Sequence, residues 1–420
     1  MEITGIERIK LGDRVIAQSD ETHTILHDVN SITTVKITTE SYQIIKDLCD
    51  RRISLYKAFE MCESEDDRNY LTDVLEYLLQ NKIVRSDVDE SEYETMGMRI
   101  DLDITNRCNL RCKHCCVDAG KKNDDLSTDD LMDVIKKIIS VNPEGIVISG
   151  GEPLIRSDFM ELISAIRSVY FGKLDLMTNA ILMTEDMAKF LKDYFDSISV
   201  SVDGYDEATC SIVRGVGSFS KIIEGLRLLK NAGVENISAS MVLDKYTYNK
   251  KNKFSELCKE LGVTPVMRVL SMTGRAEKEM GEYAIPSLED EEYECEELEE
   301  RIDSKDVIRM CKLFSCGAGY RQFQVDYKGN IYPCQSLMKD ELCLGNVLEI
   351  DDLNEYLRKR KFITTKGYRE LEKYFPYNFS GCSGCNKQLM CWTCVETIYR
   401  SRERNSDCDR CSEVFDKFFA

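Results

Sequence analysis

Apolar and polar residues alternate with two different periods along the middle of this chain. Residues 98–104 alternate strictly, which is typical of a strand, whereas residues 127–140 carry their apolar side chains on one helical face. Strand and helix patterns succeed one another between residues 96 and 275, which predicts about six parallel βα units. We therefore expect an α/β fold, a partial (β/α)6 TIM-like barrel that is open on one side. Further strands are expected at 145–149, 174–177, 197–204, 236–243 and 265–271, and further helices at 218–232 and 250–261.

The segment before the expected barrel has a different pattern. Residues 1–95 contain a β-branched strand at 32–37, followed by three short amphipathic patterns that are typical of helices. Strands followed by three short helices predict a small separate domain. The helical patterns lie at 39–48, 55–62 and 66–81.

Composition narrows the function. The chain has 420 residues, 19 cysteines, three histidines and a formal net charge of −19. An acidic surface repels nucleic acids and anionic lipids, so neither is an expected partner. No apolar run is long enough to span a membrane, and the polar first residues show no signal-peptide pattern, so we expect a cytoplasmic protein. Disulfides do not persist in the cytosol, so the many cysteines indicate metal centres. The few histidines disfavour a Ser-His-Asp hydrolase and a histidine-rich metal site.

Three of the cysteines follow the first barrel strand directly. Cys108, Cys112 and Cys115 form a CxxxCxxC pattern on the loop at its carboxyl end, where barrels place their chemistry. Thiolates select zinc, copper(I) or iron-sulfur clusters, and three ligands on a four-iron cluster would leave one iron open. The alternative is a zinc site with His114 as the fourth ligand, although His114 lies so close to Cys112 and Cys115 that a tetrahedral site would be cramped.

This loop resembles the signature of the radical S-adenosylmethionine (SAM) enzymes. The resemblance implies a 4Fe-4S cluster on Cys108, Cys112 and Cys115, with SAM bound to the open iron and split into a 5'-deoxyadenosyl radical. It places His114 near the adenine. In such enzymes the cofactor performs the difficult step, while the protein positions it and excludes water.

Later segments resemble the SAM-binding elements of the same family. Gly150-Gly151-Glu152-Pro153 matches the element that binds the SAM amino group, and Thr178-Asn179 is close to a Thr-Asn-Gly element in which Ala180 replaces the glycine. That replacement argues against a turn with positive φ at residue 180. The resemblance further implies Ser201 and Asp203 as partners of the ribose and carboxylate, and Arg214 as a partner of the SAM carboxylate.

A Gly-Arg-Ala element at 274–276 resembles the one that leads out of the barrel in radical enzymes with extra cluster domains. After it we expect a helical bridge at 276–310 and a cysteine-rich segment at 311–420. The cysteine-rich segment resembles the SPASM domain, which implies two auxiliary 4Fe-4S clusters. A zinc ribbon is the alternative, and Cys343 is left over, as a core thiol or a shielded redox residue. By position, one cluster would use Cys311, Cys316, Cys334 and Cys394, and the other Cys382, Cys385, Cys391 and either Cys408 or Cys411.

Residues 1–95 resemble the winged-helix recognition element (RRE) of peptide-modifying radical enzymes, in which a leader peptide adds to a sheet edge. A DNA-binding winged helix and a purely stabilising domain are the alternatives, and the acidic charge disfavours the first.

The three elements together resemble a maturase of ribosomally made peptides. The resemblance implies a precursor peptide with a leader as substrate, and an electron donor such as flavodoxin or ferredoxin. We expect an intramolecular thioether crosslink of the sactipeptide or ranthipeptide type; a carbon-carbon crosslink or an epimerisation is the next alternative. An anaerobic sulfatase maturase is less expected, because Gln335 follows Cys334 where that family has an aspartate that accepts a proton. A non-catalytic iron-sulfur or zinc protein that escorts a peptide is the remaining alternative.

Overall fold

The computed structural model describes residues 6–12, 14–28, 33–87, 97–120, 125–283, 316–383, 385, 388–389 and 394–401. The chain divides into two compact units. One contains residues 97–288 and 318–371, here called the barrel unit, and the other contains residues 1–96, 289–317 and 372–420, here called the terminal unit.

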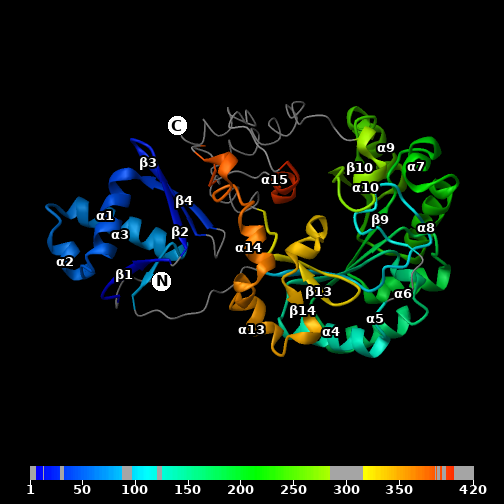
Figure 1. Cartoon of the computed structure of the whole chain (residues 1–420), viewed down its shortest axis with the longest axis horizontal. Helices are drawn as coiled ribbons and strands as arrows, with labels where there is room; N and C mark the ends of the chain where they lie inside the picture. Colours follow the sequence, from blue (N-terminus) through cyan, green and yellow to red (C-terminus); the bar gives the residue numbers. More distant parts are fainter. Residues whose placement is uncertain are drawn as a thin grey trace. The chain divides into compact units, whose positions relative to one another are not determined.

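The barrel unit is built on one sheet, which has nine strands among the described residues, in the order β11-β10-β9-β8-β7-β6-β12-β13-β14. The six strands from β6 to β11 pair in parallel, as the alternating pattern predicted. Helices lie along the outer side of these strands (Figure 1). This is the α/β partial barrel with a parallel sheet that we expected. The strands are β6 (Arg99–Asp103), β7 (Gly145–Ser149), β8 (Lys173–Thr178), β9 (Ser197–Ser201), β10 (Ile237–Leu243) and β11 (Thr264–Val269).

Helices α4, α6 and α7 begin at side-chain caps and bury one apolar face. In α4, the side chain of Ser127 accepts a hydrogen bond from the Asp130 amide, and Leu131 and Ile138 are buried. The sequence analysis did not single out α5, α6 or α7. The helices are α4 (Thr128–Ser140), α5 (Phe159–Val169), α6 (Glu185–Tyr194), α7 (Glu207–Arg214), α8 (Ser218–Ala232), α9 (Lys251–Leu261) and α10 (Ala276–Glu279).

Strand alternation gives the inner face of the barrel its own set of side chains. Leu176 on β8 and Val200 on β9 are fully buried, whereas their neighbours Met177 and Ser201 line a cavity. Because successive side chains of a strand point to opposite faces, and residues paired across parallel strands share a face, the cavity-lining residues form one inner surface. That surface combines serine hydroxyls with apolar side chains such as Met177.

The cysteine-rich segment extends the same sheet. Strand β12 (Gln322–Val325) pairs in parallel with β6, and β13 (Asn330–Tyr332) and β14 (Gly345–Asn346) follow in antiparallel order. Helices α13 (Leu353–Arg358) and α14 (Lys366–Glu372) come next. Hydrogen bonds between β12 and β6 join this part of the cysteine-rich segment to the barrel. The cysteine-rich segment is therefore divided between the two compact units.

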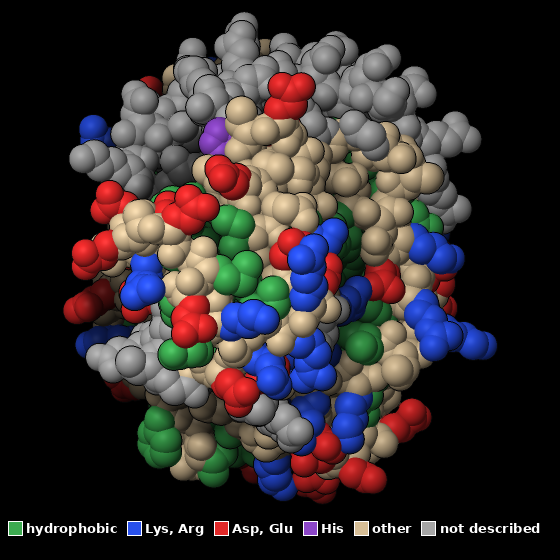
Figure 2. All heavy atoms as spheres, turned by 90° about the vertical axis from the view of Figure 1, so that its left-hand side faces the viewer, with side chains coloured by type: hydrophobic (Ala, Val, Ile, Leu, Met, Phe, Trp, Pro, Cys, Tyr) green, Lys and Arg blue, Asp and Glu red, His purple; other side chains and the backbone are tan. Residues whose placement is uncertain are grey.

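The terminal unit contains two small antiparallel sheets and three helices from the N-terminal part of the chain. Leu26, Ile45 and Leu75 lie in its core. The three helices lie where the pattern predicted them. On the face shown in Figure 2, Lys and Arg side chains are interspersed with Asp and Glu. The elements are β1 (Ile9–Leu11) with β5 (Val84–Ser86), the sheet of β2 (Val15–Ser19), β3 (His23–Asp28) and β4 (Thr33–Thr38), and helices α1 (Thr39–Asp50), α2 (Leu55–Glu60) and α3 (Glu65–Gln80).

The later part of the terminal unit contacts this N-terminal domain. The Gln18 side chain donates to the carbonyl of Cys385 at 3.1 Å, and the His27 ring packs at 5.8 Å from the ring of Tyr377. Helix α15 (Val395–Ser401) ends the described residues. Most of the predicted bridge, residues 284–310, lies outside them. None of the described helices is long and apolar enough to cross a membrane.

Candidate active site

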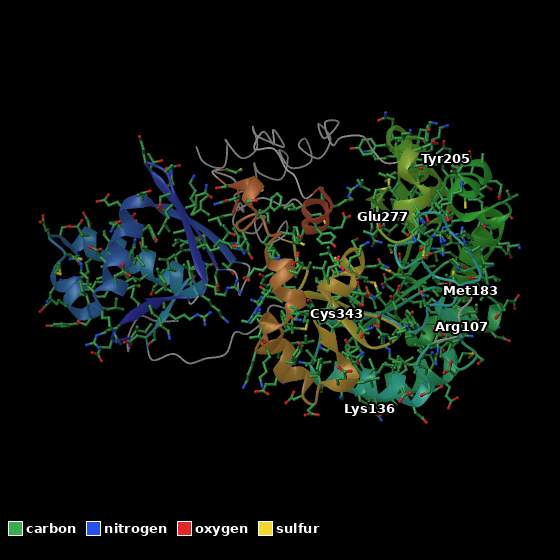
Figure 3. The ribbon with its side chains drawn as sticks, viewed as in Figure 1. Arg107, Lys136, Met183, Tyr205, Glu277 and Cys343 are labelled. Carbon is green, nitrogen blue, oxygen red and sulfur yellow. The ribbon has the colours of Figure 1, made fainter. Side chains whose placement is uncertain are left out.

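A cavity of about 250 Å3 opens at the carboxyl ends of the barrel strands. Its lining comes from the loops that follow β6, β7, β8 and β9, from the ends of β10 and β11, and from Gln335 and Ser336. Figure 3 labels Arg107 on the loop after β6 and Tyr205 on the loop after β9, which are two of these loops. The site thus lies where the position of the cysteine loop predicted it.

The structure brings Cys108, Cys112 and Cys115 together in this lining. The Cys108 amide donates to the carbonyl of Gly120 at 2.9 Å, which closes the loop on itself. Burial raises the pKa of Cys108 to about 12 and also raises that of Cys112, and a bound metal centre would favour the thiolate form of both sulfurs. Soft sulfur donors on one loop therefore fit an iron-sulfur cluster; their role as its ligands stays a prediction.

His114 lines the same cavity and binds a carboxylate. Its Nε2 lies 2.6 Å from Oδ2 of Asp203, and its Nδ1 is buried without a hydrogen-bond partner in the described structure. The zinc alternative needed His114 beside the cysteines as a fourth ligand, and the imidazole is instead held by a carboxylate. Across the described residues, no three His, Cys, Asp or Glu side chains converge on a single metal ion.

Asp203 connects three walls of the cavity. Besides His114, its Oδ2 accepts from Nε of Arg214 at 2.8 Å, and its Oδ1 accepts from the Val242 amide at 2.7 Å. Burial opposes ionisation of this carboxyl, but Arg214 and His114 outweigh it and lower the pKa of Asp203 below its usual value. Arg214 also donates towards Sγ of Cys112 at 3.7 Å. Asp203 and Arg214 thus form a buried ion pair beside the cysteine loop, while Ser201 lines the same cavity.

The two glycines of the predicted SAM-binding element pack on the cysteine loop. A Cβ at Gly150 would lie 2.3 Å from the Thr105 carbonyl oxygen, and one at Gly151 would lie 2.2 Å from that of Arg107. Only glycine permits this approach. Gly150 and Gly151 line the cavity, whereas Glu152 and Pro153 are buried and are not among its lining residues.

The buried Glu152 carboxylate organises the neighbouring strand end. It accepts from the Thr178 hydroxyl at 2.6 Å and from the Asn179 amide at 2.7 Å. Burial raises the pKa of Glu152, although these hydrogen bonds oppose the shift. Thr178 and Asn179 line the cavity, and the Asn179 side-chain amide donates to Oδ1 of Asn109 at 2.8 Å; their contact with SAM stays a prediction.

The expectation against a positive φ at residue 180 is wrong. Ala180 has a φ of 56°. The Thr178 hydroxyl accepts from the Ala180 amide at 3.0 Å, and the Asn179 side chain accepts from the Ile181 amide at 3.0 Å. These local side-chain hydrogen bonds hold the turn, so that it forms without glycine.

Two positioning residues were missed by the sequence analysis. Asp125 accepts from the Thr105 hydroxyl at 2.6 Å, from Nε of Arg107 at 2.8 Å and from the Asn106 amide, and so supports the loop after β6. Arg275 lines the cavity and donates to the carbonyl of Cys112 at 2.8 Å. No local pattern marks Asp125, whereas Arg275 lies in the Gly-Arg-Ala element.

Only part of the cysteine-rich segment is described. Cys311, Cys391, Cys408 and Cys411 lie outside the described residues. Cys316 and Cys394 lie near enough to interact: burial, and then Cys316, raise the pKa of Cys394 to about 11. The Cys385 amide donates to the Cys382 carbonyl at 3.1 Å. Within each of these pairs the proposed ligands are neighbours, and Cys334 lies in the barrel unit.

Parts of this chain match two known protein families. The Radical SAM superfamily matches residues 102–258, and the SPASM iron-sulfur cluster-binding domain matches residues 316–386. The mycofactocin maturase MftC of Mycolicibacterium smegmatis is 27% identical over 299 residues, which cover 67% of this chain and 74% of that protein.

Solved structures show the same fold. Streptococcus suis SuiB bound to S-adenosylmethionine has a TM-score of 0.57 at 15% identity and covers 94% of this chain and 97% of its own. Native anSMEcpe with bound AdoMet has a TM-score of 0.54 at 20% identity, covering 76% of this chain and 96% of its own.

Proposed function

Because this chain is a radical SAM enzyme that carries a SPASM domain, we propose that it matures a ribosomally made precursor peptide by forming an intramolecular crosslink. The observation that carries the proposal is the cysteine-lined cavity in a chain that resembles a peptide maturase over two thirds of its length. A SuiB structure with the precursor peptide SuiA, which covers 95% of this chain at a TM-score of 0.57, adds support.

We assign the cofactor sites as follows. Cys108, Cys112 and Cys115 hold the 4Fe-4S cluster, and the cluster and SAM together supply a 5'-deoxyadenosyl radical that removes hydrogen from the peptide. The backbone of Gly150 and Gly151, which lines the cavity, would face the SAM amino group. The unpartnered Nδ1 of His114 is available to the adenine. The remaining SAM contacts come from Thr178, Asn179, Ser201, Asp203 and Arg214.

The protein contributes order and exclusion of water. Asp203 holds His114 and Arg214 in fixed orientations, and Glu152 holds the Thr178-Asn179 turn. Both carboxylates are buried, so they need not reorganise when a ligand binds. This preorganisation suits a reaction in which a reactive radical must meet only one hydrogen of the substrate.

We assign leader recognition to the N-terminal domain. Its sheet has the order β2-β3-β4, so β2 and β4 are the outer strands, and three helices follow as in a winged-helix recognition element. An outer strand offers backbone groups to a further strand, which is how a leader peptide would bind. The mixed charges seen in Figure 2 suit a peptide better than the phosphates of nucleic acid.

The cysteine-rich segment would hold two auxiliary clusters. Forming a crosslink removes two hydrogens from the peptide, one as an atom and the other as a proton and an electron. Fully cysteine-ligated clusters suit acceptance of that electron. A flavodoxin or ferredoxin would supply the electron that starts each turnover.

We favour a thioether product over the oxidation of a sulfatase. Gln335 lines the cavity directly after Cys334, and an amide cannot act as the proton acceptor that a sulfatase maturase has there. The mass of the product and its number of free thiols distinguish a thioether from a carbon-carbon crosslink and from an epimerisation. A thioether lowers the mass by two hydrogens and consumes a thiol, a carbon-carbon bond lowers the mass alone, and an epimerisation changes neither.

SAM cleavage tests the enzyme directly. The anaerobically reconstituted chain, given dithionite and SAM, should release 5'-deoxyadenosine, and the variant with Cys108→Ala, Cys112→Ala and Cys115→Ala should not. Short peptides encoded beside the gene should then be co-expressed and weighed. Equal SAM cleavage by the variant and the unaltered chain contradicts the proposal. The proposal is also contradicted if no co-expressed peptide is modified while peptides from sulfatases are oxidised.

A further inference from the structure

The segment that follows the last barrel strand binds the cysteine loop through Arg275, and these contacts are here called the clamp. Nη1 of Arg275 donates to the carbonyl of Cys112 at 2.8 Å, and its Nη2 donates to the carbonyl of Ala119. The Arg275 amide donates to the carbonyl of Cys115 at 2.9 Å. One residue therefore binds the backbone of two predicted cluster ligands and the end of their loop, 156 residues or more away in sequence.

Gly274 makes this contact possible. It has a φ of 60°, and a Cβ there would lie 2.2 Å from the carbonyl oxygen of Cys116 and 2.7 Å from that of Cys115. A side chain cannot fit between the two segments. The backbone of residues 274–275 thus rests directly on the backbone of residues 115–116.

Burial makes the clamp specific for arginine. Arg275 is only 4% exposed, and its Nε forms an ion pair with Oδ1 of Asp118 at 2.9 Å, without the geometry of a hydrogen bond. A guanidinium presents five N–H donors in a fixed plane, so that it can bridge two carbonyls and a carboxylate together. A lysine ammonium is a point charge that cannot span the same three acceptors in this geometry.

We propose that Arg275 is a positioning residue for the cluster. It would hold the Cys112–Ala119 segment in the shape that lets the three thiolates meet one cluster, and it would keep a positive charge beside Cys112. A nearby positive charge favours the reduced, more negative state of a cluster, so that it raises the reduction potential. This inference rests on the proposed radical SAM chemistry, since it presupposes a cluster on the three cysteines.

The test compares Arg275→Gln and Arg275→Lys with a matched control, Arg167→Gln. Arg167 also bridges two carbonyls and an aspartate, those of Tyr194, Gly172 and Asp196, but at the opposite end of the barrel strands. Each protein is reconstituted anaerobically, and three properties are measured: iron content, the change in the EPR spectrum of the reduced protein when SAM is added, and the potential of the signal that changes.

We expect Arg275→Gln to weaken cluster retention by about tenfold, as loss of an outer-shell partner does at other metal sites. It should diminish the SAM-dependent spectral change and lower the potential of what remains. Arg275→Lys should keep the potential nearer to that of the unaltered chain while still losing iron. Arg167→Gln should lower the unfolding temperature and leave the SAM-dependent signal intact.

The outcomes separate the two proposals. If the unaltered chain shows the SAM-dependent signal and Arg275→Gln matches it in iron, spectrum and potential, the positioning role is wrong and the radical chemistry stands. If the unaltered chain shows no such signal, both fall. Should Arg275→Gln not fold, Arg275→Lys decides alone: full iron retention and an unchanged spectrum overturn the clamp.

Discussion

The imidazole of His114 and the carboxylate of Asp203 meet at 2.6 Å, although 89 residues separate them in the sequence. The same Asp203 oxygen binds Arg214, so one buried carboxylate holds two side chains of the cavity. Whichever ligand enters the cavity meets groups whose orientations are already determined.

Asp203→Asn should therefore weaken the contacts that hold His114 and Arg214 in the cavity. Arg214 would lose its buried counter-charge, which costs about 3–5 kcal/mol when one partner of a buried pair is removed. We expect a large fall in unfolding temperature and weaker SAM binding in equilibrium dialysis. The control is Asp206→Asn at the exposed cap of α7, where asparagine caps equally well and stability should hardly change. Unaltered SAM affinity in Asp203→Asn would remove this residue from the site.

Glu152→Gln should disturb the turn after β8. A glutamine can replace only one acceptor oxygen, so that either the Thr178 hydroxyl or the Asn179 amide loses its buried partner, at a cost of about 1–3 kcal/mol. Release of 5'-deoxyadenosine should fall with stability. Glu161→Gln, on the exposed side of α5, is the comparison in chemical denaturation. Equal unfolding free energies for the two variants would contradict the role of Glu152.

Gly225→Ala should destabilise the same turn from outside. A Cβ on this residue of α8 would lie 2.2 Å from the carbonyl oxygen of Ala180, so helix and turn must separate. Overpacking of this kind costs about 1–3 kcal/mol. Gly281→Ala, where nothing lies within 4 Å of the added Cβ, should leave the unfolding temperature unchanged. A tolerated Gly225→Ala would show that the turn can move freely.

The N-terminal domain should lose stability in acid through His27. Burial lowers the pKa of His27 from 6.5 to about 4, so the folded form binds fewer protons than the unfolded form between these values. Stability from the neutral ring is present above pH 6.5 and is lost as the pH falls towards 4, by about 3 kcal/mol in all. Thermal unfolding of the full chain across this range measures it.

His27→Gln should flatten that pH dependence. His23→Gln, at the start of the same strand, should not, because His23 is more exposed than His27 and its ring forms a hydrogen bond with the Thr22 hydroxyl at the surface. If both variants retain the slope of the unaltered chain, another group causes it.

The sequence by itself determined the parts that depend on short spacing. The alternation at 98–104 and the short apolar run at 145–149 predicted strands that the structure has as β6 and β7, and the CxxxCxxC pattern predicted three thiols on one loop at the end of β6. Periodicity and ligand spacing are local properties, since a strand or a loop of a few residues shows its whole pattern within a short window.

Tertiary structure alone decided the contacts between distant segments. No local sequence pattern predicts three of these contacts. They are the ion pair of Asp203 with Arg214, the hydrogen bond of Arg275 with Cys112 and the pairing of β12 with β6. The positive φ of Ala180 belongs here too, because Glu152 and Gly225 hold its turn from two other elements. Such pairings depend on how the chain folds back on itself, and a single sequence carries no local signal for them.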